Sequence, residues 1–317
     1  MLSKSALILP YYGSYPIWMN AFLRSCMYNP SLTWLIFSDL EKPKYQPDNV
    51  QFFHLEKEAL SELIKQKTGI HHALENPHKL CDFKPLYGHI FEDYLVDYQF
   101  WGHCDMDIIW GDMDRFLLEI GFEQFDLVSS RFHAISGHFT LYRNIEALKV
   151  FYQSVPCYHQ AFTKSNYQGF DEGFYSYHIF NEVKSGRLNI KPYWEKRNCI
   201  DRAELLRHPG NWIWGKGKIH NRWGLTGNYL HLIDWKRTLR EVNLGAPEQL
   251  NRFSISAFGL WKGRIPWQYQ RRLFFRWGFR KKYQYWKHRL KTFVKHQLLH
   301  TENEMEANVP EGYKTLS

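Results

Sequence analysis

The stretch that decides the fold is Phe100-Trp101-Gly102-His103-Cys104-Asp105-Met106-Asp107. Its first part, up to Cys104, predicts a short strand. Side chains alternate along a strand, so Asp105 and Asp107 point the same way where the strand ends. Two carboxylates placed in this way offer the hard oxygen ligands that Mg²⁺ and Mn²⁺ prefer. The stretch therefore predicts a strand with a divalent-metal site at its end.

Strands and helices alternate on both sides of this stretch. Short apolar or β-branched runs predict strands, and apolar residues at helical spacing predict helices. The predicted strands are 5–9, 33–37, 51–55, 100–104, 126–130 and 136–142, and the predicted helices are 17–26, 56–67 and 84–95. Alternation of this kind predicts an α/β protein with a parallel sheet and with ligands at the carboxyl ends of the strands.

The composition is that of a globular protein, with 317 residues of which 44% are hydrophobic and 23% charged. It excludes wholesale disorder and a collagen-like fibre. No run approaches the roughly 18 uncharged apolar residues that a membrane-spanning helix needs, and the first residues do not have the pattern of a signal peptide. The five cysteines are an odd number without a Cys-x-x-Cys pair, which favours reduced thiols. We therefore expect a cytoplasmic protein.

A second acidic pair, Asp112 and Asp114, repeats the spacing of the first pair seven residues later. The residues that follow it favour the start of a helix, with Asp112 as the N-cap. Asp-x-Asp alone arises often by chance, so the spacing does not decide between a metal site and a cap. We expect the first pair to be functional and the second to be structural.

Two ordered blocks resemble a known family. The block Lys79-Leu80-Cys81-Asp82-Phe83-Lys84-Pro85 leads to the stretch 100–107, and together they resemble bacterial glycosyltransferases of the GT-A type that act in polysaccharide biosynthesis. The resemblance covers roughly residues 5 to 235 and is more specific than an isolated Asp-x-Asp. It implies a Rossmann-like GT-A nucleotide-sugar-binding fold in a catalytic domain of residues 1–245, with Asp105 and Asp107 as metal ligands.

The same resemblance implies residues that bind the donor. Tyr11 ends the first strand and could stack on a uracil, although simple packing explains it equally well. Asp39 ends the second strand, where a carboxylate could bind the base or the ribose. Asp82 would orient the donor sugar and Lys84 would contact the phosphates, while an exposed pair at the start of a helix is the alternative for both. Gly137-His138-Phe139 opens a strand that would border the donor sugar.

Later residues are implied at the acceptor and at the metal. Asp171 or Glu172 would act as general base on the acceptor hydroxyl if the reaction inverts the anomeric centre, and would only bind sugar hydroxyls if it retains the configuration. In the block 229–236, His231 is implied as the third metal ligand and Lys236 as a contact of the diphosphate. A packed core histidine is the alternative for His231.

The C-terminal part of the chain is basic. From Gln249 to Thr301 there are thirteen lysines and arginines and no acidic residue, so the net charge of +9 belongs to this part. We expect a basic, aromatic, helical extension at 246–300 and a disordered tail at 301–317. Cations interleaved with aromatic residues at 261–298 favour contact with an anionic membrane. Docking of this segment on the catalytic domain is nearly as well supported, and both are favoured over binding of nucleic acid.

The predicted function is that of a metal-dependent glycosyltransferase, hexosyltransferase-like, with Mn²⁺ or Mg²⁺ as cofactor. It would move a sugar from a nucleotide-sugar, with UDP the favoured carrier, to a glycan or lipid-linked acceptor in bacterial surface-polysaccharide synthesis. Such an enzyme would work in the cytoplasm, at the inner face of the cell membrane. The alternatives are a non-enzymatic carbohydrate-binding protein and a metal-dependent phosphodiesterase.

Overall fold

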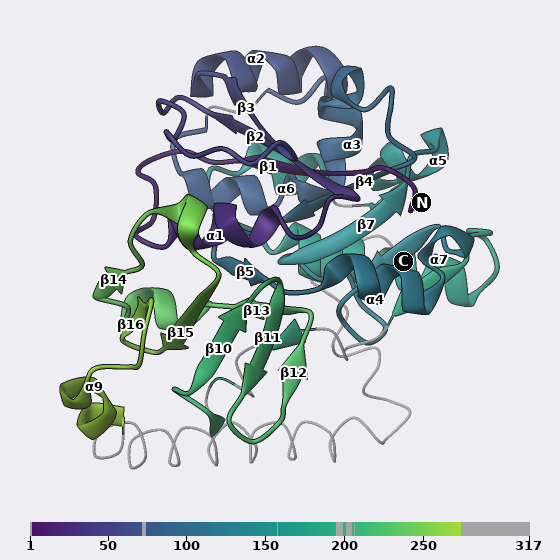
Figure 1. The fold of residues 1–317 in the computed structure, drawn as a ribbon. Helices are drawn as coiled ribbons and strands as arrows, with labels where there is room; N and C mark the ends of the chain where they lie inside the picture. The colour runs from purple at the N-terminus through teal and green to yellow at the C-terminus, as the bar shows by residue number, and fades with distance from the viewer. Residues whose placement is uncertain are drawn as a thin grey trace.

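The computed structural model describes residues 2–71, 74–156, 158–194, 199–200, 205 and 207–273. A seven-stranded sheet in the order β3-β2-β1-β4-β7-β6-β8 forms its centre (Figure 1). Its first four strands are parallel to one another, whereas β7 is antiparallel to both of its neighbours. The strands are β1 (Ser5–Pro10), β2 (Leu32–Ser38), β3 (Val50–His54), β4 (Phe100–Cys104), β6 (Leu127–Ser129), β7 (Phe139–Arg143) and β8 (Pro192–Trp194). The α/β prediction is confirmed, but the sheet is mixed rather than wholly parallel.

Helices cover both faces of this sheet. Side chains alternate along β1, so Ala6 and Ile8 pack into one core cluster while Leu7 and Leu9 pack into another. The first cluster contains residues of α2, α3, α5, α6 and α7, and the second contains residues of α1 and α4. The helices are α1 (Met19–Cys26), α2 (Lys57–Thr68), α3 (Tyr87–Ile90), α4 (Met113–Ile120), α5 (Glu146–Lys149), α6 (Tyr158–Thr163) and α7 (Ser176–Lys184). The strand ends are therefore the places where this sheet can meet a ligand.

Two smaller sheets pack beside the central one. A six-stranded sheet has the order β12-β11-β10-β15-β16-β14, and a three-stranded sheet has the order β5-β13-β9. The indole of Trp214 in β10 donates a hydrogen bond of 2.7 Å to the backbone oxygen of Trp110 in β5, which joins the two. Their strands are β5 (Ile108–Trp110), β9 (Cys199–Ile200), β10 (Trp212–Gly215), β11 (Lys218–Asn221), β12 (Thr226–Gly227), β13 (Tyr229–His231), β14 (Glu241–Asn243), β15 (Arg252–Ser256) and β16 (Gly259–Trp261).

The predicted domain boundary at residue 245 is wrong. β15 and β16 lie inside the six-stranded sheet, so the first part of the segment 246–300 is β-structure and not a helical extension. The reason is the alternation in β15, which buries Phe253 and Ile255 in the core that this sheet forms. A helix, α9, follows at Trp267–Arg272. Residues 274–300 and the predicted disordered tail 301–317 lie outside the described residues.

The predicted helix at 84–95 is broken into short pieces. A 3₁₀ turn at Lys84–Leu86, the single turn of α3 and a second 3₁₀ turn at Glu92–Tyr94 replace it. Gly88 brings the middle piece close to β4, because a Cβ at Gly88 would come within 2.3 Å of the indole ring of Trp101. The apolar spacing read from the sequence reflects burial on β4 and not a continuous helix.

Two expectations about the environment of the chain can be compared with the described residues. No helix among them is long and apolar enough to cross a membrane. Cys26, Cys81 and Cys104 are free thiols, as the sequence predicts.

Candidate functional site

A cavity of about 500 Å³ opens where β1 and β4 end. β1 lies between β2 on one side and β4 on the other, so the strand order reverses between β1 and β4. In open α/β sheets, ligands bind in the crevice at such a reversal, outside the carboxyl ends of the strands. Tyr11, directly after β1, and Asp105 and Asp107, directly after β4, all line this cavity. The topology therefore places the predicted metal stretch at the position where a ligand is expected.

Asp105, Asp107 and His231 form a cluster whose ligand atoms all lie within 4.8 Å of one another. Nε2 of His231 is 3.6 Å from Oδ2 of Asp105 and 3.3 Å from Oδ1 of Asp107. His231 reaches this position because β13 pairs antiparallel with β5, which sets His231 opposite Ile108. The cluster thus depends on a strand pairing between two segments that are far apart in the sequence, residues 108–110 and 229–231.

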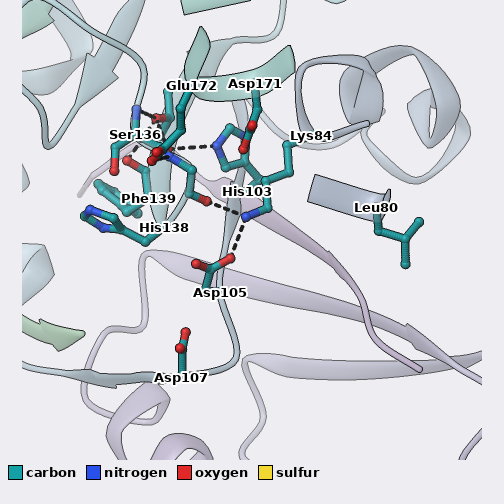
Figure 2. A network of polar contacts seen from close by, with 12 residues as sticks. Leu80, Lys84, His103, Asp105, Asp107, Ser136, His138, Phe139, Asp171 and Glu172 are labelled. Carbon is teal, nitrogen blue, oxygen red and sulfur yellow. Dashed lines mark hydrogen bonds and ion pairs between the residues drawn. The ribbon is translucent and has the colours of Figure 1, made fainter. Parts of the chain in front are cut away.

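The other oxygen of each carboxylate is held by a lysine. The Lys84 ammonium donates to Oδ1 of Asp105 and, at 2.7 Å, to the backbone oxygen of Gly137 (Figure 2). The Lys236 ammonium is 2.7 Å from Oδ2 of Asp107. Each carboxylate therefore turns one oxygen to a lysine and the other to His231.

The charges of these groups stabilise one another. Burial on its own would raise the pKa of Asp107, but His231 and Lys236 outweigh it and hold that pKa well below its ordinary value. Burial on its own would lower the pKa of His231, whereas Asp107 and Asp105 raise it. Asp107 is therefore held as an anion between His231 and Lys236.

The three ligand atoms fit a divalent cation. Adjacent ligands of an octahedral Mg²⁺ held at about 2.1 Å lie about 3 Å apart, which is close to the separations between His231 and the two carboxylates. Carboxylate oxygens together with one imidazole nitrogen suit Mn²⁺ or Mg²⁺. Asp105, Asp107 and His231 could hold such an ion through Oδ2, Oδ1 and Nε2, and Lys84 and Lys236 would keep the carboxylates oriented.

Asp171 and Glu172 form another part of the cavity wall, next to Gly137. Glu172 accepts a hydrogen bond of 2.8 Å from the backbone N–H of Gly137 and pairs with Arg131 at 2.9 Å. A Cβ at Gly137 would lie 2.9 Å from Oδ2 of Asp171, so only a glycine leaves room for both carboxylates. Burial raises the pKa of Asp171 to about 6, against a lowering influence of Lys84. Glu172 is thus held in place by Arg131 and Gly137, whereas Asp171 is a carboxylate with a raised pKa.

His138 lies beside the metal cluster and also lines the cavity. Its ring lies 4.5 Å from the ring of His231, and its Nδ1 is 2.8 Å from the hydroxyl of Tyr229. Burial, followed by the nearby His231 and Lys84, lowers the pKa of His138 well below its ordinary value. A neutral imidazole beside the cluster can act as a hydrogen-bonding group without adding charge.

Two predicted site residues do not line the cavity. Asp39 directly follows β2 and is not among the residues that line the cavity. Asp82 is fully buried and pairs with Lys79 at 2.9 Å. Its carboxylate also accepts hydrogen bonds from the backbone N–H groups of Gln168 and Phe170, at 2.8 and 2.7 Å. Asp82 therefore fixes the segment that precedes Asp171, and its complete burial contradicts the alternative of an exposed helix start.

The cavity contains aromatic residues that the sequence analysis did not single out. Trp18 donates a hydrogen bond of 3.0 Å from its indole to the backbone oxygen of Met106, between the two metal-site carboxylates. His78 and Tyr167 face each other with ring centroids 4.6 Å apart, and both line the cavity. The aromatic content of 18% was the only signal for such residues, and it does not say which rings meet.

The fold and the cavity define a mixed α/β protein with a candidate divalent-metal site at the ends of its central strands. The chain belongs to a family of unknown function (DUF6625), whose model matches residues 7–236. A comparison with curated proteins gave no match. The matched range includes every residue that lines the cavity, from Leu9 to Lys236, and leaves out β14, β15 and β16. The part of the chain that defines the family is thus the part that builds the cavity.

Proposed function

We propose that the protein is a metal-dependent glycosyltransferase with a Rossmann-like GT-A fold. It would move a sugar from a nucleotide-sugar, with UDP the favoured carrier, to a glycan or lipid-linked acceptor in bacterial surface-polysaccharide synthesis. The observation that supports this most is the Asp105, Asp107 and His231 cluster at the end of β4, inside a cavity at the reversal of strand order. The sequence resemblance described above supplies the reaction class.

The donor side of this proposal uses the cluster and its two lysines. A bound divalent cation would supply Lewis-acid stabilisation of the diphosphate as it leaves. Lys84 and Lys236 bring two positive charges to the same wall, and both are within reach of the phosphates that such a metal would hold. Tyr11 lies on the cavity wall at the end of β1, where its ring can pack against a nucleobase.

On the acceptor side, Asp171 suits the role of general base better than Glu172. Glu172 is held by Arg131 and by the N–H of Gly137, so it positions its surroundings. Asp171 accepts a hydrogen bond of 3.0 Å from the hydroxyl of Tyr167, and its pKa of about 6 leaves it ionised but basic at neutral pH. A base with a pKa near the working pH accepts a proton most effectively in the transition state.

The proposal can be tested by thermal stability against a panel of UDP-, GDP-, CMP- and dTDP-sugars, each with and without Mn²⁺. A ligand that binds only the folded state adds about 2.7 kcal/mol to the free energy of unfolding at 100 times its Kd. We expect one nucleotide class to raise Tm, and only with metal present. Asp107→Asn should abolish that shift, whereas Asp112→Asn, which changes the other acidic pair, should leave it.

Two results would contradict the proposal. If no nucleotide-sugar raised Tm but free oligosaccharides did, the protein would be a carbohydrate-binding module. If Asp107→Asn and Asp112→Asn responded alike to Mn²⁺ and nucleotide, the cluster would not be the metal site. Turnover of the responding nucleotide-sugar, followed as release of the nucleoside diphosphate, then separates a transferase from a protein that only binds its ligand.

A further inference from the structure

A second cavity, of about 540 Å³, lies on the outer face of the six-stranded sheet. Along β10 and β15 the side chains alternate: Trp212, Trp214, Phe253 and Ile255 are buried in the core between the sheets. The residues between them point outward, so Ile213 and its partner across the ladder, Ser254, line the cavity. This face points away from the core cluster that contains Trp212 and Trp214. In Figure 1, β10, β11 and β12 lie at the opposite end of the molecule from α2.

The lining of this cavity is strongly basic. Arg222, Arg252, Lys262 and Arg264 all line it, and all four are exposed. No ion pair between described residues includes any of them. The continuous described segment 207–273 carries twelve lysines and arginines against three acidic residues. By charge complementarity the face suits an anion that several cations can contact at once.

Exposed aromatic residues adjoin this basic lining. Trp223 is 50% exposed and follows Arg222, whose guanidinium lies 4.3 Å from the centre of the Trp223 ring. Trp267 is 67% exposed and lies 4.9 Å from the guanidinium of Arg271 in the same way. Cations together with exposed tryptophan are typical of surfaces that lie at the level of lipid headgroups.

We propose that this face binds the phosphate headgroups of an anionic phospholipid membrane. Each lysine or arginine near such a surface adds to the affinity, and an arginine fork matches a phosphate group in geometry. The aromatic rings favour a membrane over a single-stranded nucleic acid. His208 packs against Trp223 at 4.7 Å and Arg222 lies over the same ring, so the chain's own side chains already occupy part of the ring surface on which a base would stack. The proposal does not depend on the proposed enzymatic function.

Vesicle sedimentation with the full chain tests this inference. The four-fold variant Arg222→Gln, Arg252→Gln, Lys262→Gln, Arg264→Gln removes the basic lining. The matched control Lys42→Gln, Lys44→Gln, Lys164→Gln, Lys184→Gln removes the same charge from exposed lysines elsewhere. We expect wild type and control to bind vesicles of phosphatidylcholine mixed with anionic phosphatidylglycerol. Neither protein should bind vesicles of phosphatidylcholine alone. The four-fold variant should bind at least about tenfold more weakly, with an unchanged Tm.

Several results would overturn the inference. Equal weakening in both variants would show a general charge effect, and unchanged binding in the four-fold variant would place the membrane contact elsewhere in the chain. If vesicles did not bind but inorganic phosphate raised the Tm of wild type alone, the cavity would hold a small anion. If the four-fold variant lost affinity for a single-stranded RNA while vesicle binding persisted, the face would be a nucleic-acid site. Release of wild type from vesicles by about 0.5 M NaCl is expected without any mutation.

Discussion

The two acidic pairs of this protein have the same spacing and lie seven residues apart, yet their surroundings differ completely. Asp105 and Asp107 lie between β4 and β5, next to His231 in the lining of the cavity. Asp112 and Asp114 stand at the start of α4 and bind backbone N–H groups. Both pairs come after a strand, so the element that follows each pair is what differs. The first pair is followed by β5 and lines the cavity, whereas α4 begins within the second pair and Asp112 caps it.

The same contrast separates the other buried carboxylates. Asp82 is fully buried and accepts hydrogen bonds from Lys79 and from backbone N–H groups. In the second acidic pair, Asp112 likewise accepts from an N–H of α4 and Asp114 from the N–H of Ser31. Asp171 lines the cavity and has a raised pKa, as befits a group whose charge is not fully compensated. We therefore distinguish carboxylates that hold the fold from carboxylates that face the cavity, and the following predictions test this distinction.

The largest effect is expected at Asp82. Asp82→Asn leaves the fully buried ammonium of Lys79 without its carboxylate partner. Removing one member of a buried ion pair costs about 3–5 kcal/mol in the free energy of unfolding, which denaturant titration measures. The double variant Lys79→Met, Asp82→Leu should recover part of that loss, because no unpaired charge remains. If Asp82→Asn kept full stability and lost only nucleotide-sugar binding, Asp82 would be a ligand of the donor, as the sequence suggested.

A smaller and opposite effect on stability is expected at Asp171. Its pKa in the folded protein, about 6, lies above the ordinary value of 3.8, so the folded state binds the proton more tightly than the unfolded state does. The stabilisation from this proton is complete below about pH 4 and is lost as the pH rises through about 6. Asp171→Asn should therefore raise the free energy of unfolding by about 1–3 kcal/mol at pH 8 and leave it nearly unchanged near pH 4.

Measurements of activity show whether Asp171 is a catalytic base or only a buried carboxylate with a raised pKa. In wild type, kcat/KM should rise with pH through about 6 as Asp171 ionises, and Asp171→Asn should lose both activity and this limb of the profile. Glu172→Gln is the matched control: it breaks the pair with Arg131 and should give no gain in stability at pH 8. Retention of full activity by Asp171→Asn, together with higher stability, would leave Asp171 without a catalytic role.

Much of the central fold could be predicted from local sequence pattern. Apolar runs gave the positions of β1, β2 and β4, because a strand buried on both faces reads as a continuous apolar stretch. The helix at 84–95 was misjudged because its apolar spacing serves burial against Trp101. β15 was missed because the basic composition around it hid the alternation that buries Phe253 and Ile255. Composition describes a long segment, whereas a strand needs only five residues.

The candidate site could be predicted only in part. Asp105 and Asp107 were found from their spacing after a strand, which is local information. His231 was implied by the resemblance alone, because its approach to them depends on the pairing of β13 with β5, which spacing along the chain does not encode. The opposite case is Asp82, whose sequence position suggested the donor sugar but whose side chain turns into the core. Long-range strand pairing and the direction of a side chain are tertiary properties, and single-sequence patterns do not reach them.

The smallest effect, and the one that completes the comparison of the two acidic pairs, is expected at Asp112. Its carboxylate accepts a hydrogen bond of 3.2 Å from the N–H of Arg115 and so caps α4. Asp112→Ala removes the cap and should lower the free energy of unfolding by about 1 kcal/mol, whereas Asp112→Ser restores a capping oxygen and should lower it by less. In both variants the response of Tm to Mn²⁺ and nucleotide-sugar should equal that of wild type. A loss of this response in Asp112→Ala that Asp112→Ser did not repair would show that the second pair also serves the metal, and the element that follows a carboxylate pair would then not distinguish its role.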